Sequence, residues 1–257
     1  MTTQLADPGT QFRLDGKVAL ITGASSGIGA RLAEVYAAAG ATVYAAARRR
    51  ERLDELAART GVEAVTCDVA DEAQCEAAVT HVVERHGAVD VLVNCAGVST
   101  ITKALDESRE TFARTVEVNL VGTFSMSRLA GRSMVEQGSG SIVNIASIVG
   151  LVGIGRMPQA GYAASKAGVV NLTRELAAQW ARKGVRVNSI APAFFETEMT
   201  EGLFDGGKGE EWVASLTPMG RGGKLHELDG AALFLASAAS SYVTGITIPV
   251  DGGWTAV

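Results

Sequence analysis

The stretch VALITGASSGIG, residues 18–29, decides the fold, because an apolar strand runs directly into a glycine-rich turn and then a helix. Glycines allow the backbone to turn sharply and to approach a pyrophosphate, whose charge then lies at the N-terminus of the helix. A plain tight turn is the alternative, since the spacing differs from the GxGxxG form. The turn predicts a dinucleotide site formed by Gly23, Ser25, Ser26, Gly27, Ile28 and Gly29.

Short apolar runs alternate with longer amphipathic runs along the rest of the chain. The predicted strands are 18–22, 42–46, 63–67, 89–93, 141–145, 186–190 and 246–250, and the predicted helices are 27–39, 51–59, 72–86, 108–136, 161–183 and 225–237. Strict alternation implies right-handed crossovers, and nearly continuous apolar strands imply helices on both faces of the sheet. We expect an α/β fold with a Rossmann-type doubly wound parallel sheet of about seven strands.

No repeat or low-complexity linker divides the sequence. We therefore expect a flexible N-terminal tail over residues 1–11 and a single catalytic domain over 12–257. Within it, residues 194–224 carry seven glycines among apolar side chains and are predicted to be irregular. Such a segment is typical of a mobile substrate lid, with a surface loop of no special role as the alternative.

Composition excludes several classes of function. The chain of 257 residues has a net charge of −5 without long acidic or basic blocks, which argues against binding nucleic acid. No apolar stretch approaches the roughly 18 residues that span a membrane, and residues 1–9 do not read as a secretory signal. Three cysteines without CxxC spacing and three scattered histidines argue against disulfides and a metal site. We expect a cytoplasmic protein.

The end of the second predicted strand indicates which cofactor is bound. An NAD enzyme usually places an acid there for the ribose hydroxyls, but this strand ends at Ala47 and continues into Arg48 and Arg49. Guanidinium groups bind a 2′-phosphate through bidentate, charge-assisted hydrogen bonds. The sequence therefore predicts NADP(H), with NAD(H) as runner-up. Alternatively, these arginines only begin a solvated helix.

Tyr162 and Lys166 lie four residues apart on a predicted helix and so share one face. A nearby ammonium favours the phenolate and brings the pKa of a tyrosine toward neutral pH. This spacing alone is an ordinary surface feature, so its meaning depends on the rest of the sequence.

Six motifs give that context. They are Thr22-Gly23-x3-Gly27-x-Gly29, Asp68-Val69, Asn94-Cys95-Ala96-Gly97, Asn119, Ser147 and Tyr162-Ala163-Ala164-Ser165-Lys166, followed by Pro192, Thr197 and Val250-Asp251-Gly252-Gly253. In this order they resemble the short-chain dehydrogenase/reductase family over nearly the whole chain. The resemblance implies an enzyme that moves a hydride between a nicotinamide cofactor and a small-molecule carbonyl or secondary alcohol.

The resemblance also implies individual roles. Tyr162 would exchange a proton with the substrate oxygen, Ser147 would hydrogen-bond that oxygen, and Lys166 would bind the nicotinamide ribose and lower the Tyr162 pKa. Asn119 would hold a water that links Lys166 to solvent. Beyond the glycine turn, the cofactor would contact Arg48, Arg49, Asp68, Val69, Asn94, Ala96, Gly97, Tyr162, Lys166, Pro192, Phe195 and Thr197.

Two departures from the family pattern concern specificity. Ser147 and Tyr162 are fifteen residues apart where the family has about thirteen, which predicts a two-residue insertion beside the substrate within 152–159. Pro192-Ala193 replaces the family's Pro-Gly pair, and Ser26 stands where many NADP enzymes carry a basic residue, so Arg48 must supply most of the discrimination.

Substrate identity stays open. The candidate pocket wall is apolar and favours a hydrophobic ketone or acyl chain over a bare sugar. It consists of Val98, Ile148, Leu151, Ile154, Phe194, Met199, Leu203, Phe204 and Trp212. The alternatives are an NAD-dependent sugar or secondary-alcohol dehydrogenase and a non-catalytic dinucleotide sensor.

Assembly is a further expectation from the resemblance, which implies that helices 108–136 and 161–183 pair with their symmetry mates in a homotetramer or homodimer. Small residues would allow the close approach, and two larger ones would bury area against the partner. The small residues are Ala163, Ala167 and Ala177, and the larger ones are Val170 and Trp180.

Overall fold

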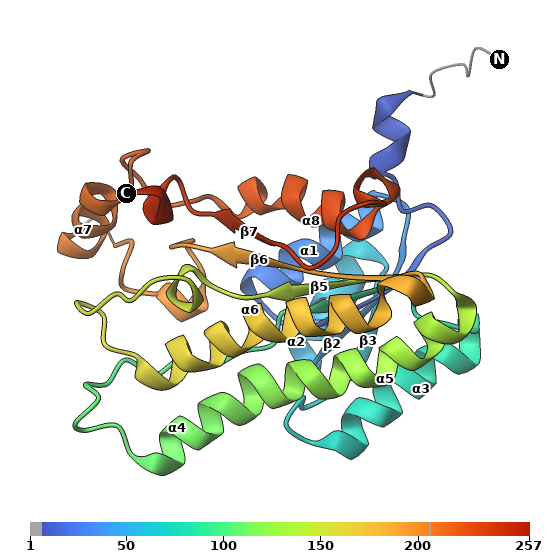
Figure 1. The fold of residues 1–257 in the computed structure, drawn as a ribbon, viewed down its shortest axis with the longest axis horizontal. Helices are drawn as coiled ribbons and strands as arrows, with labels where there is room; N and C mark the ends of the chain where they lie inside the picture. Colours follow the sequence, from blue (N-terminus) through green and yellow to red (C-terminus); the bar gives the residue numbers. More distant parts are fainter. Residues whose placement is uncertain (1–6, 206) are drawn as a thin grey trace.

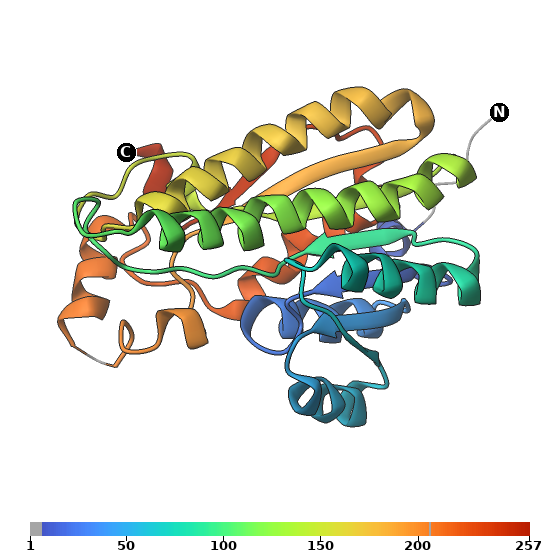
Figure 2. The same ribbon diagram turned by 90° about the horizontal axis from the view of Figure 1, so that it is seen from below.

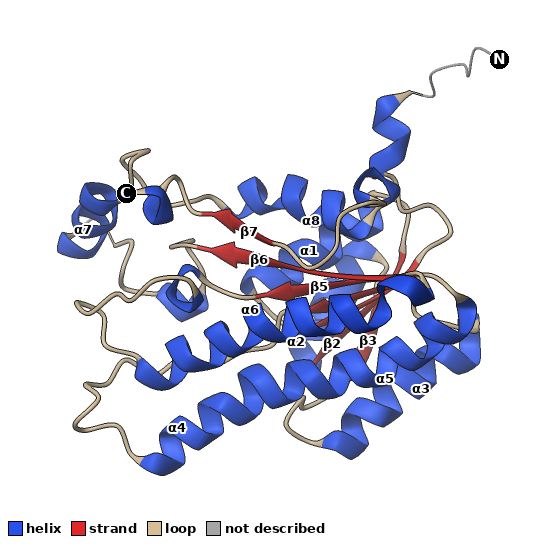
Figure 3. Cartoon of the chain, in the orientation of Figure 1, coloured by secondary structure: helices blue, strands red, loops and turns tan. Residues whose placement is uncertain are grey.

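Seven parallel strands form one sheet in the computed structural model, which describes residues 7–205 and 207–257. The strands are β1 (Val18–Thr22), β2 (Thr42–Ala47), β3 (Glu63–Thr66), β4 (Val91–Asn94), β5 (Gly140–Ile145), β6 (Val185–Pro192) and β7 (Thr247–Val250). Their order in the sheet is β3-β2-β1-β4-β5-β6-β7, so the direction of winding reverses between β1 and β4. Open α/β sheets bind ligands outside the carboxyl ends of the strands at such a reversal. Figure 3 shows the arrowheads of β5, β6 and β7 at one side of the molecule.

Helices cover both faces of this sheet, as the sequence predicts (Figure 1). The helices α1 (Gly27–Ala38), α2 (Arg50–Thr60) and α8 (Asp229–Ala236) pack on one face, and α3 (Glu72–His86), α5 (Gly122–Gln137) and α6 (Ala160–Trp180) pack on the other. In β1, Ile21 belongs to the first of these two cores and Leu20 to the second. Both faces of the strand are therefore buried, which explains why its sequence is continuously apolar.

The predicted helix 108–136 is interrupted by a wider turn. It consists of α4 (Arg109–Val116), a π-helical turn (Glu117–Val121) and α5, which follow one another with little change of direction (Figure 2). A π-turn inside a helix is rare and often marks a functional site. The side chain of Asn119 lies within this turn and is fully buried. The sequence prediction treated residues 108–136 as one continuous helix and so did not include the interruption.

The prediction that residues 194–224 are irregular was wrong for its middle part. A short 3-10 helix spans Glu198–Thr200, and α7 spans Lys208–Leu216 beyond the carboxyl end of β6 (Figure 1). The helix forms because Val213 is fully buried and Trp212 packs on Phe194 and Trp254, with ring centroids 5.4 Å and 5.6 Å apart. The flanking glycines concealed this short amphipathic pattern. The lid function of the segment stays a prediction.

The expected tail over residues 1–11 lies partly outside the described residues, since the structure describes the chain from Asp7 onward. Pro8–Phe12 form a 3-10 helix whose residues are all exposed. Among the described residues, no helix combines the length and apolar character needed to cross a membrane.

Two residues expected at a partner interface are instead used inside the chain. Val170 is buried against its own sheet, and the Trp180 ring lies so close to Gly131 that a Cβ there would be 2.9 Å from it. Ala177 is also buried in the core. Val170 and Ala177 thus pack inside the chain and Trp180 packs on α5, so these residues do not argue for an interface.

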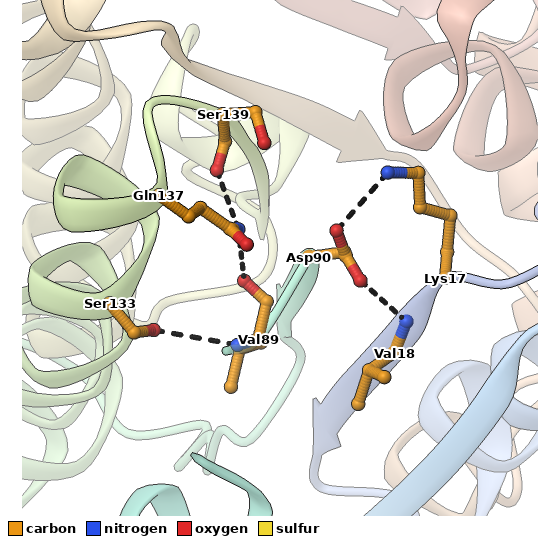
Figure 4. A network of polar contacts seen from close by, with 7 residues as sticks. All are labelled: Lys17, Val18, Val89, Asp90, Ser133, Gln137 and Ser139. Carbon is orange, nitrogen blue, oxygen red and sulfur yellow. Dashed lines mark hydrogen bonds and ion pairs between the residues drawn. The ribbon is translucent and has the colours of Figure 1, made fainter. Parts of the chain in front are cut away.

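Hydrogen bonds near the amino ends of β1 and β4 hold the end of the sheet at which the strands begin (Figure 4). The Asp90 carboxylate accepts hydrogen bonds from the Val18 amide at 2.9 Å and from Lys17 Nζ at 3.1 Å. The Gln137 amide donates to the Ser139 carbonyl at 2.7 Å and so holds the turn between α5 and β5. These polar groups at the amino ends of the strands are thus paired with each other, whereas polar groups at the carboxyl ends of the strands face a cavity.

Candidate active site

The glycine turn after β1 lies in close contact with the turn after β4. Gly23 has a φ of +69°, and a Cβ on it would lie 2.7 Å from the Ala96 backbone nitrogen. The Thr22 hydroxyl accepts hydrogen bonds from the Cys95 and Ala96 amides at 3.1 and 3.2 Å. Only glycine fits this position, because a side chain would both be strained and collide with backbone. The two turns together form a backbone-lined wall of the cavity.

The N-terminus of α1 opens into the same cavity. Ser26 is its N-cap residue but makes no side-chain capping bond, because its hydroxyl accepts from the Arg49 guanidinium at 2.8 Å. Unpaired amides at a helix N-terminus form a ready site for phosphate. The turn, the helix end and Arg48 and Arg49 at the end of β2 therefore fit the phosphates of a dinucleotide.

A buried tyrosine–lysine pair lies further along the cavity, on α6. Lys166 is 4% exposed, and its Nζ lies 5.6 Å from the centroid of the Tyr162 ring. The same Nζ donates a hydrogen bond to the Ile145 carbonyl at 2.6 Å, at the end of β5. Ser147, two residues further along, is also buried and caps a 3-10 helix (Ile148–Gly150). The structure thus brings Ser147, Tyr162 and Lys166 together.

Burial dominates the electrostatics of this pair. It raises the pKa of Tyr162 to about 12, and a hydrogen bond with Ser147 offsets part of that rise. Burial also lowers the pKa of Lys166 to about 8. The expected lowering of the Tyr162 pKa by Lys166 is therefore not found in this structure, because the ammonium is directed at Ile145. A lysine near its pKa at neutral pH can still exchange protons readily.

Asn119 positions the loop after β4. Its Oδ1 accepts from the Val98 amide at 2.8 Å, and its Nδ2 donates to the Val98 carbonyl at 2.9 Å and to the Ser165 hydroxyl at 3.0 Å. Ser165 in turn donates to the carbonyl of Tyr162. The side chain therefore joins this loop to α6, and the expected water between Asn119 and Lys166 stays a prediction.

A single cavity of about 1020 Å³ joins these features. It is lined by all the expected catalytic and cofactor residues except two, Asn94 and Asn119. The Asn94 side chain is buried away from the cavity, and the expected contact of Asn94 with the cofactor stays a prediction. Its Nδ2 donates to Ser127 and Asn144, both at 2.9 Å, beneath the α5–α6 face of the sheet.

The wall of the cavity near Tyr162 is mixed in polarity. Five of the nine expected apolar residues line it, namely Val98, Ile148, Phe194, Met199 and Leu203. The other four, Leu151, Ile154, Phe204 and Trp212, do not line it. Sequence reasoning missed a polar pair in the same wall, in which the Ser99 hydroxyl donates to Gln159 Oε1 at 3.2 Å.

Glu198 is a further lining residue that sequence reasoning missed. Its Oε2 accepts from Arg49 Nη2 at 2.9 Å, although the two residues are 149 positions apart. The Arg49 guanidinium holds the pKa of Glu198 below its usual range, and Ser26 adds to this effect. No local motif connects the two residues, so only the fold could reveal the contact.

The sequence as a whole matches a protein-family model. The model is described as enoyl-(acyl carrier protein) reductase and matches residues 23–255, which is nearly the whole chain.

Individual relatives are similar over their full lengths. D-threitol dehydrogenase of Mycolicibacterium smegmatis is 42% identical over 249 residues, which are 95% of each chain. The 3-oxoacyl-(acyl-carrier-protein) reductase of Thermotoga maritima is also 42% identical, over 94% of this chain and 99% of its own. Among solved structures, a gluconate 5-dehydrogenase from Burkholderia cenocepacia in complex with NADP and tartrate is 40% identical, with a TM-score of 0.91 over 96% of this chain and 98% of that one.

Proposed function

Because the chain belongs to the short-chain dehydrogenase/reductase family, we propose that it is an NADP(H)-dependent dehydrogenase that interconverts a neutral secondary alcohol and its ketone. The observation that carries the proposal is a single cavity with Arg48 near one end and Ser147, Tyr162 and Lys166 near the other. The cavity can hold both reactants of a hydride transfer. Similar proteins include dehydrogenases and reductases of C–OH and C=O groups, which supports the reaction class.

In this proposal each side chain acts on the substrate oxygen or on the proton that it gains or loses. Tyr162 gives its phenolic proton to the carbonyl oxygen during reduction and takes it back during oxidation. Ser147 hydrogen-bonds the same oxygen and fixes its distance from the phenol. Lys166 restores the proton of Tyr162, and Asn119 holds the loop and helix that frame the pair. The nicotinamide supplies or accepts the hydride when bound.

The preference for a neutral substrate follows from the charges in the cavity. Among the described residues, its basic lining residues are Arg48, Arg49 and Lys166. Lys166 donates to Ile145, and the arginines lie at the cofactor end, so no cation remains to bind a carboxylate beside Tyr162. Glu201 also lines the cavity and brings a negative charge, which disfavours an anion. Ser99 and Gln159 offer hydrogen bonds to a hydroxyl group instead.

A panel of alcohols with NADP⁺ and NAD⁺, followed by absorbance of the reduced nicotinamide, tests this proposal. We expect threitol, galactitol or a hydrophobic secondary alcohol to give a kcat/KM at least about tenfold above that of gluconate, since an unpaired buried charge costs more than a kcal/mol. A preference for gluconate would contradict the neutral substrate. Absence of turnover with every alcohol and with the matching ketones would contradict the reaction.

The alternative, NAD(H), is favoured by one specific observation. The Glu198 carboxylate already pairs with Arg49 at 2.9 Å. Of the two arginines after β2, only Arg48 is then left to bind a 2′-phosphate, which weakens the advantage of NADP(H) over NAD(H). The ratio of kcat/KM values for NADPH and NADH decides between the cofactors. A ratio below one would overturn NADP(H) as the preferred cofactor.

Self-association is supported by apolar residues on the outer face of α4 and α5. Phe112, Val121 and Phe124 are 39%, 39% and 42% exposed, and Ala164 and Ala167 are exposed on the neighbouring α6. A second copy of the chain would cover this strip in a homodimer or homotetramer. Light scattering after size exclusion tests this, since the chain mass is 26.6 kDa. An active monomer at micromolar concentration would contradict it.

We also assign the protein to the cytoplasm, because its cysteines are unpaired. Cys67, Cys75 and Cys95 are free thiols, and the first two are buried. Free thiols persist in a reducing compartment. Localisation of a tagged full-length chain in its host checks this assignment.

A further inference from the structure

Arg49 crosses the cofactor end of the cavity and joins three segments that are distant in sequence. Its Nη2 donates to Ser25 Oγ at 3.1 Å and to Ser26 Oγ at 2.8 Å, on the glycine turn. The same Nη2 donates to Glu198 Oε2 at 2.9 Å, on the 3-10 helix after β6. All four residues line the cavity. Nε and Nη2 of Arg49 are thus already directed at protein acceptors.

These contacts determine how much positive charge the site offers. Arg48 and Arg49 follow β2 directly, where an adenosine ribose with its 2′ substituent would lie. Glu198 brings a carboxylate to this group, and its lowered pKa keeps it ionised at neutral pH. A carboxylate and a phosphate compete for the same face of a guanidinium, because both accept its paired hydrogen bonds. A 2′-phosphate on Arg49 must therefore displace Glu198 or lie close to its negative charge.

We propose that Glu198 is a specificity-determining residue that weakens binding of the 2′-phosphate by pairing with Arg49, and so narrows the preference of the protein for NADP(H) over NAD(H). The inference rests on the proposed function, since it concerns the same cofactor site. It assigns the discrimination between cofactors to a residue outside the β2 region. Arg48 favours the 2′-phosphate, and Glu198 opposes it by occupying the second arginine.

The variant Glu198→Gln tests this, because it removes the charge and keeps the size of the side chain. Glu196→Gln is the matched control, since Glu196 is exposed two residues away and does not line the cavity. Calorimetry with adenosine 2′,5′-bisphosphate and with 5′-AMP measures binding without turnover. We expect Glu198→Gln to bind the bisphosphate about five- to tenfold more tightly and AMP within about twofold, because Arg49 is released from an exposed ion pair. Glu196→Gln should change neither.

A double-mutant cycle tests whether the effect of Glu198→Gln on bisphosphate binding depends on Arg49. In an Arg49→Ala background, Glu198→Gln should no longer tighten binding of the bisphosphate, since its partner is absent. Unchanged binding by Glu198→Gln, or equal tightening of both ligands, would overturn the inference. If the wild type binds and turns over a cofactor, but Glu198→Gln does not change the ratio of its affinities for the bisphosphate and AMP, only the inference fails. If wild type binds neither nucleotide and has no turnover, the proposed function fails together with it.

Discussion

Replacing Lys166 by Met provides a test of the active-site electrostatics through protein stability. Lys166 is almost fully buried, and burial lowers its pKa to about 8 from the 10.5 of a free lysine. Unfolding returns the ammonium to water, where it is more stable. Between pH 8 and 10.5 the unfolded chain therefore binds more protons than the folded chain, so the stability of the wild type rises with pH over this range.

The magnitude follows from these two pKa values. At pH 7 the buried charge costs roughly 3 kcal/mol of unfolding free energy, and at pH 9 about 2 kcal/mol, because most of the folded protein then carries a neutral amine. Methionine has the same shape without the charge and removes this cost. It also leaves the Ile145 carbonyl without the lysine donor, which costs about 1–3 kcal/mol at every pH. The difference in stability between the variant and the wild type should therefore change by about 1 kcal/mol in favour of the wild type between pH 7 and pH 9.

Urea unfolding of the protein without added nucleotide, at pH 7 and pH 9, measures this difference directly. Comparison of variant with wild type cancels the titration of Cys95, whose pKa burial raises to about 11. Lys183→Met is the control, since Lys183 is exposed after α6 and its replacement should leave the pH dependence unchanged. A constant difference between Lys166→Met and wild type at both pH values would refute the reasoning.

Three further substitutions test the cofactor and catalytic groups. Tyr162→Phe should lower kcat by about 10²–10⁴ while dinucleotide affinity, measured by fluorescence titration, stays within about twofold; near wild-type turnover would contradict its role. Arg48→Ala should raise KM for NADPH by about 10–100-fold and leave KM for NADH unchanged, whereas Arg50→Ala, outside the cavity, should alter neither. Gly23→Ala should abolish dinucleotide binding, because its Cβ would collide with the turn after β4. Gly61→Ala is the control, since Gly61 has a similar positive φ of +76° but open space around it. This control should lose only about 1 kcal/mol of stability and retain binding.

The regular elements could be predicted because their patterns are local. β1 and α3 have the predicted limits, since an apolar run and a capped amphipathic helix each report their own boundaries. The side chain of Asp71 accepts from the Gln74 amide at the start of α3 and so caps the helix. α7 was missed because it owes its stability to packing on Phe194 and Trp254, which are distant in sequence.

In the candidate site too, some residues could be predicted from local patterns and others depend on contacts that are distant in sequence. Tyr162 and Lys166 could be predicted, because helical spacing and motif order place them on one face. The direction of the Asn94 side chain could not be predicted, because the sequence does not tell whether a polar residue at the end of β4 faces the ligand or the helices. Here it faces the helices, since Asn144 on the neighbouring strand offers a partner, and the Asn144 amide itself donates to Thr173 on α6 at 2.9 Å.

The π-turn at Asn119 shows why such placements need the whole fold. Asn119 must reach the loop after β4 and also α6, and its side chain makes three hydrogen bonds to do so. The widened turn lies at this residue, and the Thr123 hydroxyl donates to the Asn119 carbonyl at 2.8 Å. A straight helix would carry the following residues out of register with the sheet, because one extra residue rotates them by about 100°. With the wide turn at Asn119 in place, the side chains of Met126 and Met134 in α5 are buried in the core against the sheet. The loop contact beside Tyr162 and the packing of α5 on the sheet are two consequences of the same turn.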